Sequence, residues 1–327
     1  MIVTVTPNPA LDLTYRLSTL TPGETHRVPA AAVRAGGKGL NVARVLHQQG
    51  HPVLAVSPAG AASGEEFAAE LRASGLQHRL VPVLAPTRRS VALVDEGQGR
   101  TTILNEYGEN HTPAEWLALA DATAAALPGA TCLVCSGSLP PGADVDFLPN
   151  LVALASARGL PSVIDTSGPA LLASARAGAT ALKPNRQELA EATGEPDPVR
   201  GARMLLEHGA GMVLVSLGEE GMLLMTAAEP GRLWRARLPR VLPGNPTGAG
   251  DAAVAAIAFC LATGLTDPAQ IIRRATAWSA AAVLMPLAGE ISPDHAALAD
   301  EIQVDELPAD FQIAELPAGD IPIEGPR

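Results

Sequence analysis

The sequence predicts an α/β fold of three layers, in which a mostly parallel central sheet lies between two sets of helices and carries a small β-sheet as a lid. Apolar segments typical of buried strands alternate with segments of helical periodicity along most of the chain. Such alternation indicates a parallel sheet covered on both faces. With 327 residues, of which 47% are hydrophobic, the chain is long enough for one large domain with a smaller insertion.

These patterns assign the individual strands and helices. Strands of the central sheet are expected at residues 1–6, 52–57, 131–136, 161–165, 180–183 and 212–216. Helices are expected at residues 39–49, 64–74, 114–127, 144–158, 185–193, 199–208, 249–263 and 268–285. Cys132 and Cys135 lie an odd number of positions apart on one predicted strand, so they should face opposite sides and pack in the core rather than bind zinc.

Two segments interrupt the alternation and define the expected organisation. Residues 12–34 and 87–106 have short strand patterns with turns between them, which indicates a β lid that keeps water from a reactive substrate. The nucleotide-binding core then comprises residues 1–11, 35–86 and 107–300. The acidic, proline-containing tail at residues 301–327 lacks periodicity, and we expect it to be a loose strap or partly disordered.

Composition argues against nucleic acid and membranes as partners. The formal net charge is -11 and aromatic residues make up only 3%, which suits neither phosphate backbones and anionic lipids nor base stacking. The first residues lack the pattern of a signal peptide, and the most apolar stretch, residues 252–263, is too short to span a bilayer. We therefore expect a cytoplasmic protein, and its 3 cysteines agree with a reducing compartment.

The two lysines of the chain, Lys38 and Lys183, both fall inside glycine-rich or polar motifs. Lysine is a compact point charge, whereas arginine is a wide planar fork, so the two are not interchangeable. In a chain whose other strong cations are all arginine, this placement indicates sites for an anionic substrate; the alternative is coincidence.

The most informative motif is the segment 245–251, Asn-Pro-Thr-Gly-Ala-Gly-Asp, which leads directly into an alanine-rich helix. Glycines permit a tight turn, and the start of the helix offers unpaired N–H groups to an anion. Asp251 would place a carboxylate beside that anion site, although an acid in a first helical turn can also serve only as a cap or dipole partner. A base beside donors for phosphoryl oxygens is what a kinase requires.

A second motif, residues 36–41, has glycines that open a helix. Lys38 and Asn41 are three positions apart, so they share one face at its start and suit a polyhydroxylated anion; the alternative is a flexible helix terminus. Asp12 follows the first strand, where ligands of open α/β sheets bind, although a lone Asp in a turn is common.

Two further polar segments follow predicted strands. Asn185 and Glu188 begin a helix, and their spacing fits a capping box as well as oxygen ligands for a hydrated magnesium ion. The segment 216–221 is a glycine-containing turn that suits either nucleotide binding or a hairpin.

Taken together and in this order, these motifs resemble the ribokinase-like (PfkB) sugar kinases along nearly the whole chain. Within that family the chain is most similar to the 1-phosphofructokinase and tagatose-6-phosphate kinase branch. The segments that carry the resemblance are residues 6–12, 36–41, 136–142, 183–188, 216–221 and 248–251.

The resemblance implies a role for each matching residue. Asp251 would be the catalytic base, with Gly248, Ala249 and Gly250 as the anion hole. The residues expected to hold the sugar phosphate are Asp12, Gly37, Lys38, Asn41, Arg88, Ser138 and, reaching from a partner subunit in some members, Arg27. The residues expected to serve ATP and Mg²⁺ are Lys183, Asn185, Glu188, Ser216, Gly218, Gly221 and Thr247, with Asn185 and Glu188 near the metal through water. The lid of this family commonly pairs two subunits, so a homodimer is implied.

The activity implied by the resemblance is transfer of a phosphoryl group from ATP to fructose 1-phosphate. Tagatose 6-phosphate and fructose 6-phosphate are alternative acceptors. An alternative of another class is a sensor that binds a sugar phosphate without catalysis, although a sensor needs no base. A dinucleotide-dependent oxidoreductase is disfavoured, because Ala253 stands where its glycine fingerprint needs a third glycine.

Overall fold

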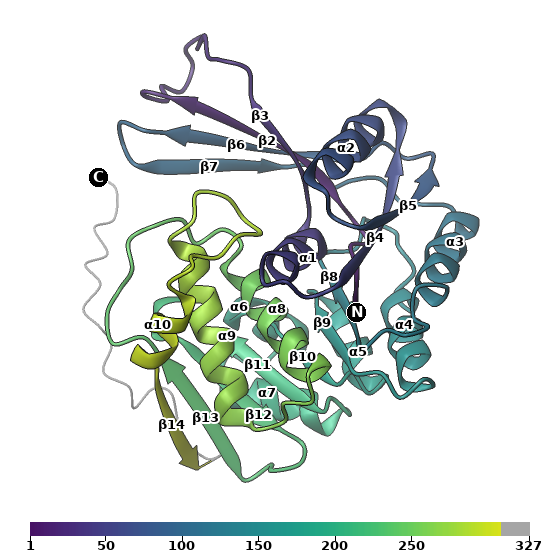
Figure 1. The fold of residues 1–327 in the computed structure, drawn as a ribbon, viewed down its shortest axis with the longest axis vertical. Coiled ribbons are helices and arrows are strands. Elements are labelled where there is room, and N and C mark those ends of the chain that lie inside the picture. The colour runs from purple at the N-terminus through teal and green to yellow at the C-terminus, as the bar shows by residue number, and fades with distance from the viewer. Residues whose placement is uncertain (309–327) are drawn as a thin grey trace.

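The computed structural model describes residues 1–308. A twisted sheet forms the centre of the molecule (Figure 1). Its strand order is β14-β13-β12-β11-β10-β9-β8-β1-β4-β5. Pairing is parallel from β11 through to β5, and antiparallel from β11 through to β14. The strands are β1 (Ile2–Val5), β4 (Val53–Gly60), β5 (His78–Val83), β8 (Cys132–Ser136), β9 (Ser162–Asp165), β10 (Ala181–Leu182), β11 (Met212–Ser216), β12 (Met222–Thr226), β13 (Arg232–Arg237) and β14 (Gln303–Pro308).

Helices cover both faces of this sheet, and each set has its own hydrophobic core. One core includes Leu40, Phe67, Ile257 and Trp278 and the other includes Trp116 and many smaller apolar side chains. The first set comprises α1 (Lys38–Gln48), α2 (Ala61–Ser74), α8 (Ala249–Ala262), α9 (Pro268–Val283) and α10 (His295–Glu301). The second set comprises α3 (Pro113–Ala124), α4 (Phe147–Ser156), α5 (Pro169–Arg176), α6 (Arg186–Thr193) and α7 (Pro198–Glu207).

A second, smaller sheet stands off the main body on the side of α1 and α2 (Figure 1). Its order is β3-β2-β6-β7, built from β3 (Ala32–Gly36), β2 (Ala10–Leu17), β6 (Arg88–Asp95) and β7 (Arg100–Asn105). The predicted fold class, a three-layer α/β/α arrangement with a mostly parallel sheet and a small second sheet, is confirmed.

The structure also corrects the sequence analysis at the edge of the central sheet. Residues 303–308, which the sequence assigned to a loose acidic tail, form β14 and pair antiparallel with β13. The rest of that tail lies outside the described residues. The strands β5, β12 and β13 and the short helices α5 and α10 were not predicted.

The cysteines and the helix lengths bear on which classes of protein the chain can belong to. Cys132 packs in one core and Cys135 in the other, so the two thiols point to opposite faces as expected, and both are free. Within residues 1–308, no helix is both long enough and apolar enough to cross a membrane.

Candidate active site

A cleft of about 760 Å³ lies between the carboxyl ends of the central strands and the small sheet. This is where open α/β sheets bind their ligands. Most residues singled out in the sequence line it, although they come from segments far apart in the chain. The predicted residues that line the cleft are Asp12, Gly37, Lys38, Asn41, Arg88, Ser138, Lys183, Asn185, Glu188, Ser216, Thr247, Gly248, Gly250 and Asp251.

The starts of two helices meet in this cleft. Asn41 lies in the first turn of α1 and Asp251 in the first turn of α8, and the two helices pack against each other. The Nδ2 of Asn41 donates a hydrogen bond to Oδ2 of Asp251 at 2.7 Å. The positive ends of both helix dipoles therefore point toward the same part of the cleft, an arrangement that favours negative charge there.

Asp251 is a buried carboxylic acid with a raised pKa. Its side chain is almost fully buried, with 6% of its surface exposed. Burial is the main cause that raises its pKa to about 7, and the nearby Asp165 adds to the rise, whereas Lys38, Asn41 and Lys183 oppose it. A base whose pKa lies near neutral pH both carries a negative charge and accepts a proton readily.

The turn before α8 leaves backbone N–H groups available. Gly248 has φ of 88° and ψ of -6°, a left-handed conformation that favours glycine, and α8 has no side-chain cap. The first N–H to donate along the helix is that of Ala252, to the carbonyl of Gly248 at 2.9 Å, while that of Ala249 donates to Pro246 at 3.2 Å. The amides of Gly250 and Asp251 have no carbonyl four positions earlier within the helix, which is the general state of a helix start.

Asp165, at the end of β9, joins the two lysines and was not recognised in the sequence. It is fully buried, and its carboxylate lies 3.4 Å from Nζ of Lys38 and 3.6 Å from Nζ of Lys183. Ser136 also donates to it, at 3.0 Å. Burial disfavours its charge, but Lys183, Lys38 and Ser136 outweigh burial and hold its pKa below the usual range. The signal available was its place as the last residue of a predicted strand.

Lys38 is thereby held as a cation at the mouth of the cleft. Asp165 is the largest cause that raises its pKa, against the cost of burial, and Glu188 adds an ion pair at 3.3 Å. The Lys38 side chain keeps 41% of its surface exposed, so it remains available to a ligand.

The opposite side of the cleft is formed by the small sheet. Asp12 lies on β2, directly across from Ser90 of β6, and burial raises its pKa to about 6 against the opposing effect of Arg88. The Arg88 guanidinium donates to the carbonyls of Asn8 at 3.3 Å and Glu106 at 3.0 Å. This side therefore offers a carboxylate and a guanidinium to the same ligand.

Ser138 completes that side, and Asn8, which the sequence analysis did not select, holds it in place. The hydroxyl oxygen of Ser138 accepts a hydrogen bond from Nδ2 of Asn8 at 3.4 Å. Asn8 also donates to the carbonyl of Tyr107 at 3.0 Å, and both of these residues line the cleft.

Asn185 and Glu188 form the capping box that the sequence allowed. Oδ1 of Asn185 accepts from the Glu188 amide at 2.8 Å, and Oε2 of Glu188 accepts from the Asn185 amide at 2.9 Å. The other carboxylate oxygen, Oε1, faces Lys38. Within residues 1–308, no group of three or more His, Cys, Asp or Glu side chains is placed to hold a metal by itself.

A few predicted residues do not line the cleft within one chain. Arg27 is exposed in the connection between β2 and β3, and Gly218 and Gly221 flank the short turn between β11 and β12. Gly221 has a packing reason to be glycine, because a β-carbon there would collide with the carbonyl oxygen of Ala236. Ala249 lies between two residues that do line the cleft.

Comparison with known proteins shows the family of the chain. The model of the pfkB family carbohydrate kinases matches residues 5–295. A 1-phosphofructokinase from Xanthomonas campestris pv. campestris is 36% identical over 301 residues, which cover 89% of this chain and 94% of that protein. An ATP-dependent 6-phosphofructokinase isozyme 2 from Mycobacterium tuberculosis is 34% identical, covering 87% and 84%. Among solved structures, phosphofructokinase-2 from Escherichia coli matches with a TM-score of 0.83 at 30% identity, covering 91% of this chain and 98% of that one.

The fold and these relatives define the class of protein as an ATP-dependent carbohydrate kinase, a transferase that acts on sugar hydroxyls. The chain belongs to the pfkB family. The family resemblance inferred from the sequence motifs, including its 1-phosphofructokinase branch, is confirmed.

Proposed function

We propose that this kinase phosphorylates fructose 1-phosphate, with fructose 1,6-bisphosphate and ADP as products. The observation that carries the proposal is the hydrogen-bonded pair of Asp251 and Asn41, which lies in one cleft with Lys38, Asp12 and Arg88. Relatives named 1-phosphofructokinase at 36% identity support this choice of acceptor.

Asp251 accepts the proton from the acceptor hydroxyl in the proposed step. The hydroxyl oxygen forms a bond to the γ-phosphorus of ATP while the bond from that phosphorus to the β–γ bridging oxygen breaks, which leaves ADP. The amides at the start of α8 hold the oxygens of the transferring group, since the helix dipole and unpaired N–H groups favour negative charge there.

The sugar phosphate is held between the small sheet and α1. Asp12 accepts hydrogen bonds from sugar hydroxyls, and Arg88 with Ser138 binds the phosphate that the acceptor already carries. Lys38 balances the combined negative charge of the two substrates. Arg88 suits this task because its planar fork matches phosphate oxygens.

The nucleotide occupies the other half of the cleft in this proposal. Lys183, Ser216 and Thr247, which line the same cleft, would contact the nucleotide together with Asn185 and Glu188. The chemistry that Mg²⁺ supplies when bound to ATP is neutralisation of phosphate charge. Its hard, hydrated character fits a carboxylate and an amide that act through water. Glu188 and Asn185 would fill this role with the oxygen lone pairs that the capping box does not use.

An assay of ADP release across ketose phosphates tests the proposed acceptor. Fructose 1-phosphate, fructose 6-phosphate and tagatose 6-phosphate are each offered with Mg-ATP, and kcat/KM is expected to be highest for fructose 1-phosphate. A higher value for fructose 6-phosphate would favour the second candidate, which the 34% identical relatives named 6-phosphofructokinase support. Binding of all three without ADP release would favour a sensor.

We also propose that the small sheet forms a homodimer contact, as the family resemblance implies. Leu13, Val33, Val91 and Leu104 stand in one register row across its strands, which places them on one face. Val33 is 47% exposed and Leu104 is 57% exposed. Sedimentation of the full chain should give a dimer and should give a monomer for Leu104→Glu. A wild-type monomer, or a Leu104→Glu dimer of unchanged affinity, would refute this contact.

A further inference from the structure

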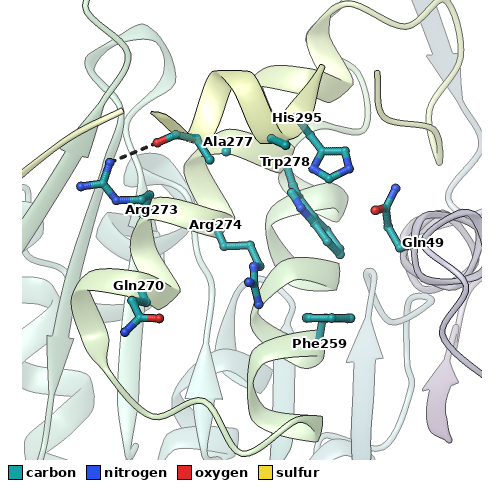
Figure 2. A pocket seen from close by; sticks show the side chains of 10 residues that line it. Gln49, Phe259, Gln270, Arg273, Arg274, Ala277, Trp278 and His295 are labelled. Carbon is teal, nitrogen blue, oxygen red and sulfur yellow. Dashed lines mark hydrogen bonds between the residues drawn. The ribbon is translucent and has the colours of Figure 1, made fainter. Parts of the chain in front are cut away.

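A second cavity, of about 390 Å³, lies between α8, α9 and α10, beside the C-terminal end of α1 (Figure 2). Its volume is within the range of pockets that bind small molecules. None of the residues that line it belongs to the cleft described above. It therefore requires a separate explanation.

Aromatic rings form one wall of this cavity. The ring centroids of Phe259 and Trp278 are 5.6 Å apart at an interplanar angle of 52°, and those of Trp278 and His295 are 6.0 Å apart at 70°. Trp278 is only 4% exposed, so its position is fixed by packing. Tilted rings in this arrangement offer both faces and edges to a planar ligand.

Arginine side chains provide positive charge beside these rings. The guanidinium carbon of Arg274 lies 5.0 Å from the centre of the Phe259 ring, and its Nη1 lies 3.6 Å from Sγ of Cys260. Arg273 donates to the carbonyls of Ala299 and Ile302. In the part of the chain that the structure describes, neither arginine forms an ion pair with a carboxylate, and no Asp or Glu lines the cavity.

This charge is unusual for a chain whose net charge is -11. A half-buried guanidinium has lost part of its hydration, and an anion that binds beside it restores the lost interaction. The aromatic surface favours a planar ring, and the cation with no acidic partner favours an anion. One small cavity therefore suits a ligand that has both.

We propose that this cavity binds a small anion that carries a flat aromatic ring. The ring packs against Phe259 and Trp278, and the anionic group pairs with Arg274. Gln49 and Gln270, which also line the cavity, supply amide groups to polar substituents of the ring. A nucleoside monophosphate has this chemistry.

The cavity is connected to the active site through two helices. Phe259 follows Asp251 by eight residues on α8, which corresponds to about 12 Å along the helix axis. At the end of α9, the carbonyl of Val283 accepts from the amide of Asn245 at 2.8 Å, just before the glycine turn. An occupied cavity changes kcat for fructose 1-phosphate through these helices, an effect that rests on the proposed function. Binding of the ligand to the cavity is independent of that function.

Fluorescence titration of the intact chain with the dye ANS, a flat aromatic sulfonate, tests the binding. We expect one main site, and an affinity about tenfold or more weaker in Arg274→Gln, because a charge-assisted contact is lost. Arg176→Gln, which removes an exposed arginine from α5, is the matched control and should bind as the wild type does. Equal affinities in the two variants would overturn the proposal.

A second pair of variants guards against a folding defect in Arg274→Gln. Ala296 lines the cavity and Ala297 does not, although both are exposed on α10. Ala296→Trp should fill the cavity and abolish the main site, while Ala297→Trp should retain it. Unchanged dye binding in Ala296→Trp would place the site elsewhere and refute the proposal.

Competition shows whether the ring is needed. AMP should displace the dye from the site defined by Arg274, and ribose 5-phosphate, which has the anion without the aromatic ring, should not. Equal displacement by the two compounds would refute the requirement for a ring. Retained dye binding in a chain that releases no ADP would separate failure of the proposed function from failure of this one.

Discussion

The helices α8 and α6 begin at the same cleft, but the acidic residue in the first turn of each has a different hydrogen-bond partner. On α6, Glu188 turns back to the backbone and closes a capping box with Asn185. On α8, the cap position is Gly248, which has no side chain, and Asp251 instead bonds to Asn41 of another helix. One helix start is satisfied by its own residues, and the other leaves its amides and its acid to the cleft.

This difference indicates how the chain divides stability from function. A capping residue contributes about 1 kcal/mol to a helix, and α8 forgoes that contribution. Its alanine-rich body is buried almost throughout, so packing holds the helix without a cap. The uncapped start can then serve an anion, and substitutions at the two helix starts should have different consequences.

The largest effect is expected at the acid of α8. Asp251→Asn keeps the shape but cannot accept a proton, so turnover should fall by about 10²–10⁴-fold. Binding of fructose 1-phosphate, measured by calorimetry, should stay nearly unchanged. Near wild-type turnover would remove Asp251 from the mechanism. Glu188→Gln, at the equivalent place on α6, should retain far more activity, because glutamine can still close the box.

The next effect is expected at the glycine that replaces the cap. Gly248→Ala puts a side chain on a left-handed residue, and its β-carbon would lie 2.8 Å from Cα of Ala288. The shifted turn should lower kcat by about tenfold or more, because misplaced donors lose transition-state contacts.

Gly264, at the other end of α8, is the matched control. It is also left-handed, with φ of 76°, but a β-carbon there meets nothing within 4 Å. Gly264→Ala should cost about 1 kcal/mol of unfolding free energy and leave kcat unchanged. Equal kinetics for the two variants would mean that the turn tolerates the change.

A smaller effect is expected in the pH dependence of activity, where Asp251 and Asp165 have different roles. The pKa of Asp251 is raised to about 7, so the carboxylate is lost as pH falls through that value, and log kcat/KM should decline below it. Asp165 is a like charge that raises this pKa, so Asp165→Asn should move the decline toward lower pH. A flat profile between pH 5 and pH 8 (a range of about 3 units around that pKa) would contradict the assignment of the base.

The smallest effect concerns the caps themselves. Asn185 caps α6, and Asp197 caps α7 by accepting from the amides of Val199 and Arg200. Alanine at either position should lower the unfolding free energy by about 1 kcal/mol in chemical denaturation. Only Asn185→Ala should also raise the KM for Mg-ATP, because only Asn185 lines the cleft. Identical kinetics for the two would make the α6 cap purely structural.

Local pattern predicted the parallel strands of the central sheet except β5, and it predicted the glycine turn of the site. Strand and helix periods depend on neighbouring residues, and the motif at 248–251 is likewise contained in consecutive residues, so both can be recognised without knowing the fold. The antiparallel edge was missed because β14 pairs with β13 from a distant part of the chain, and its acidic residues have low strand propensity. Tertiary pairing overrode the local signal.

Asp165 shows which part of the site could not be predicted from the sequence. Its segment contains no glycine fingerprint, and its meaning arises only when Lys38 and Lys183 approach it from different elements. Arg27 is the opposite case, because a single chain leaves it exposed and its predicted role needs a second subunit. The ambiguity at Asn185 and Glu188 was real, since the capping box forms and both residues still face the cleft.

The meeting of Lys38 and Lys183 at Asp165 has a practical consequence. Because these are the two lysines of the whole chain, every side-chain amine of the protein lies in the cleft between the central strands and the small sheet. Reductive methylation with isotope-labelled formaldehyde would therefore introduce spectroscopic reporters in this cleft, with the α-amino group as the remaining reactive amine, and would follow ligand occupancy without any engineered label.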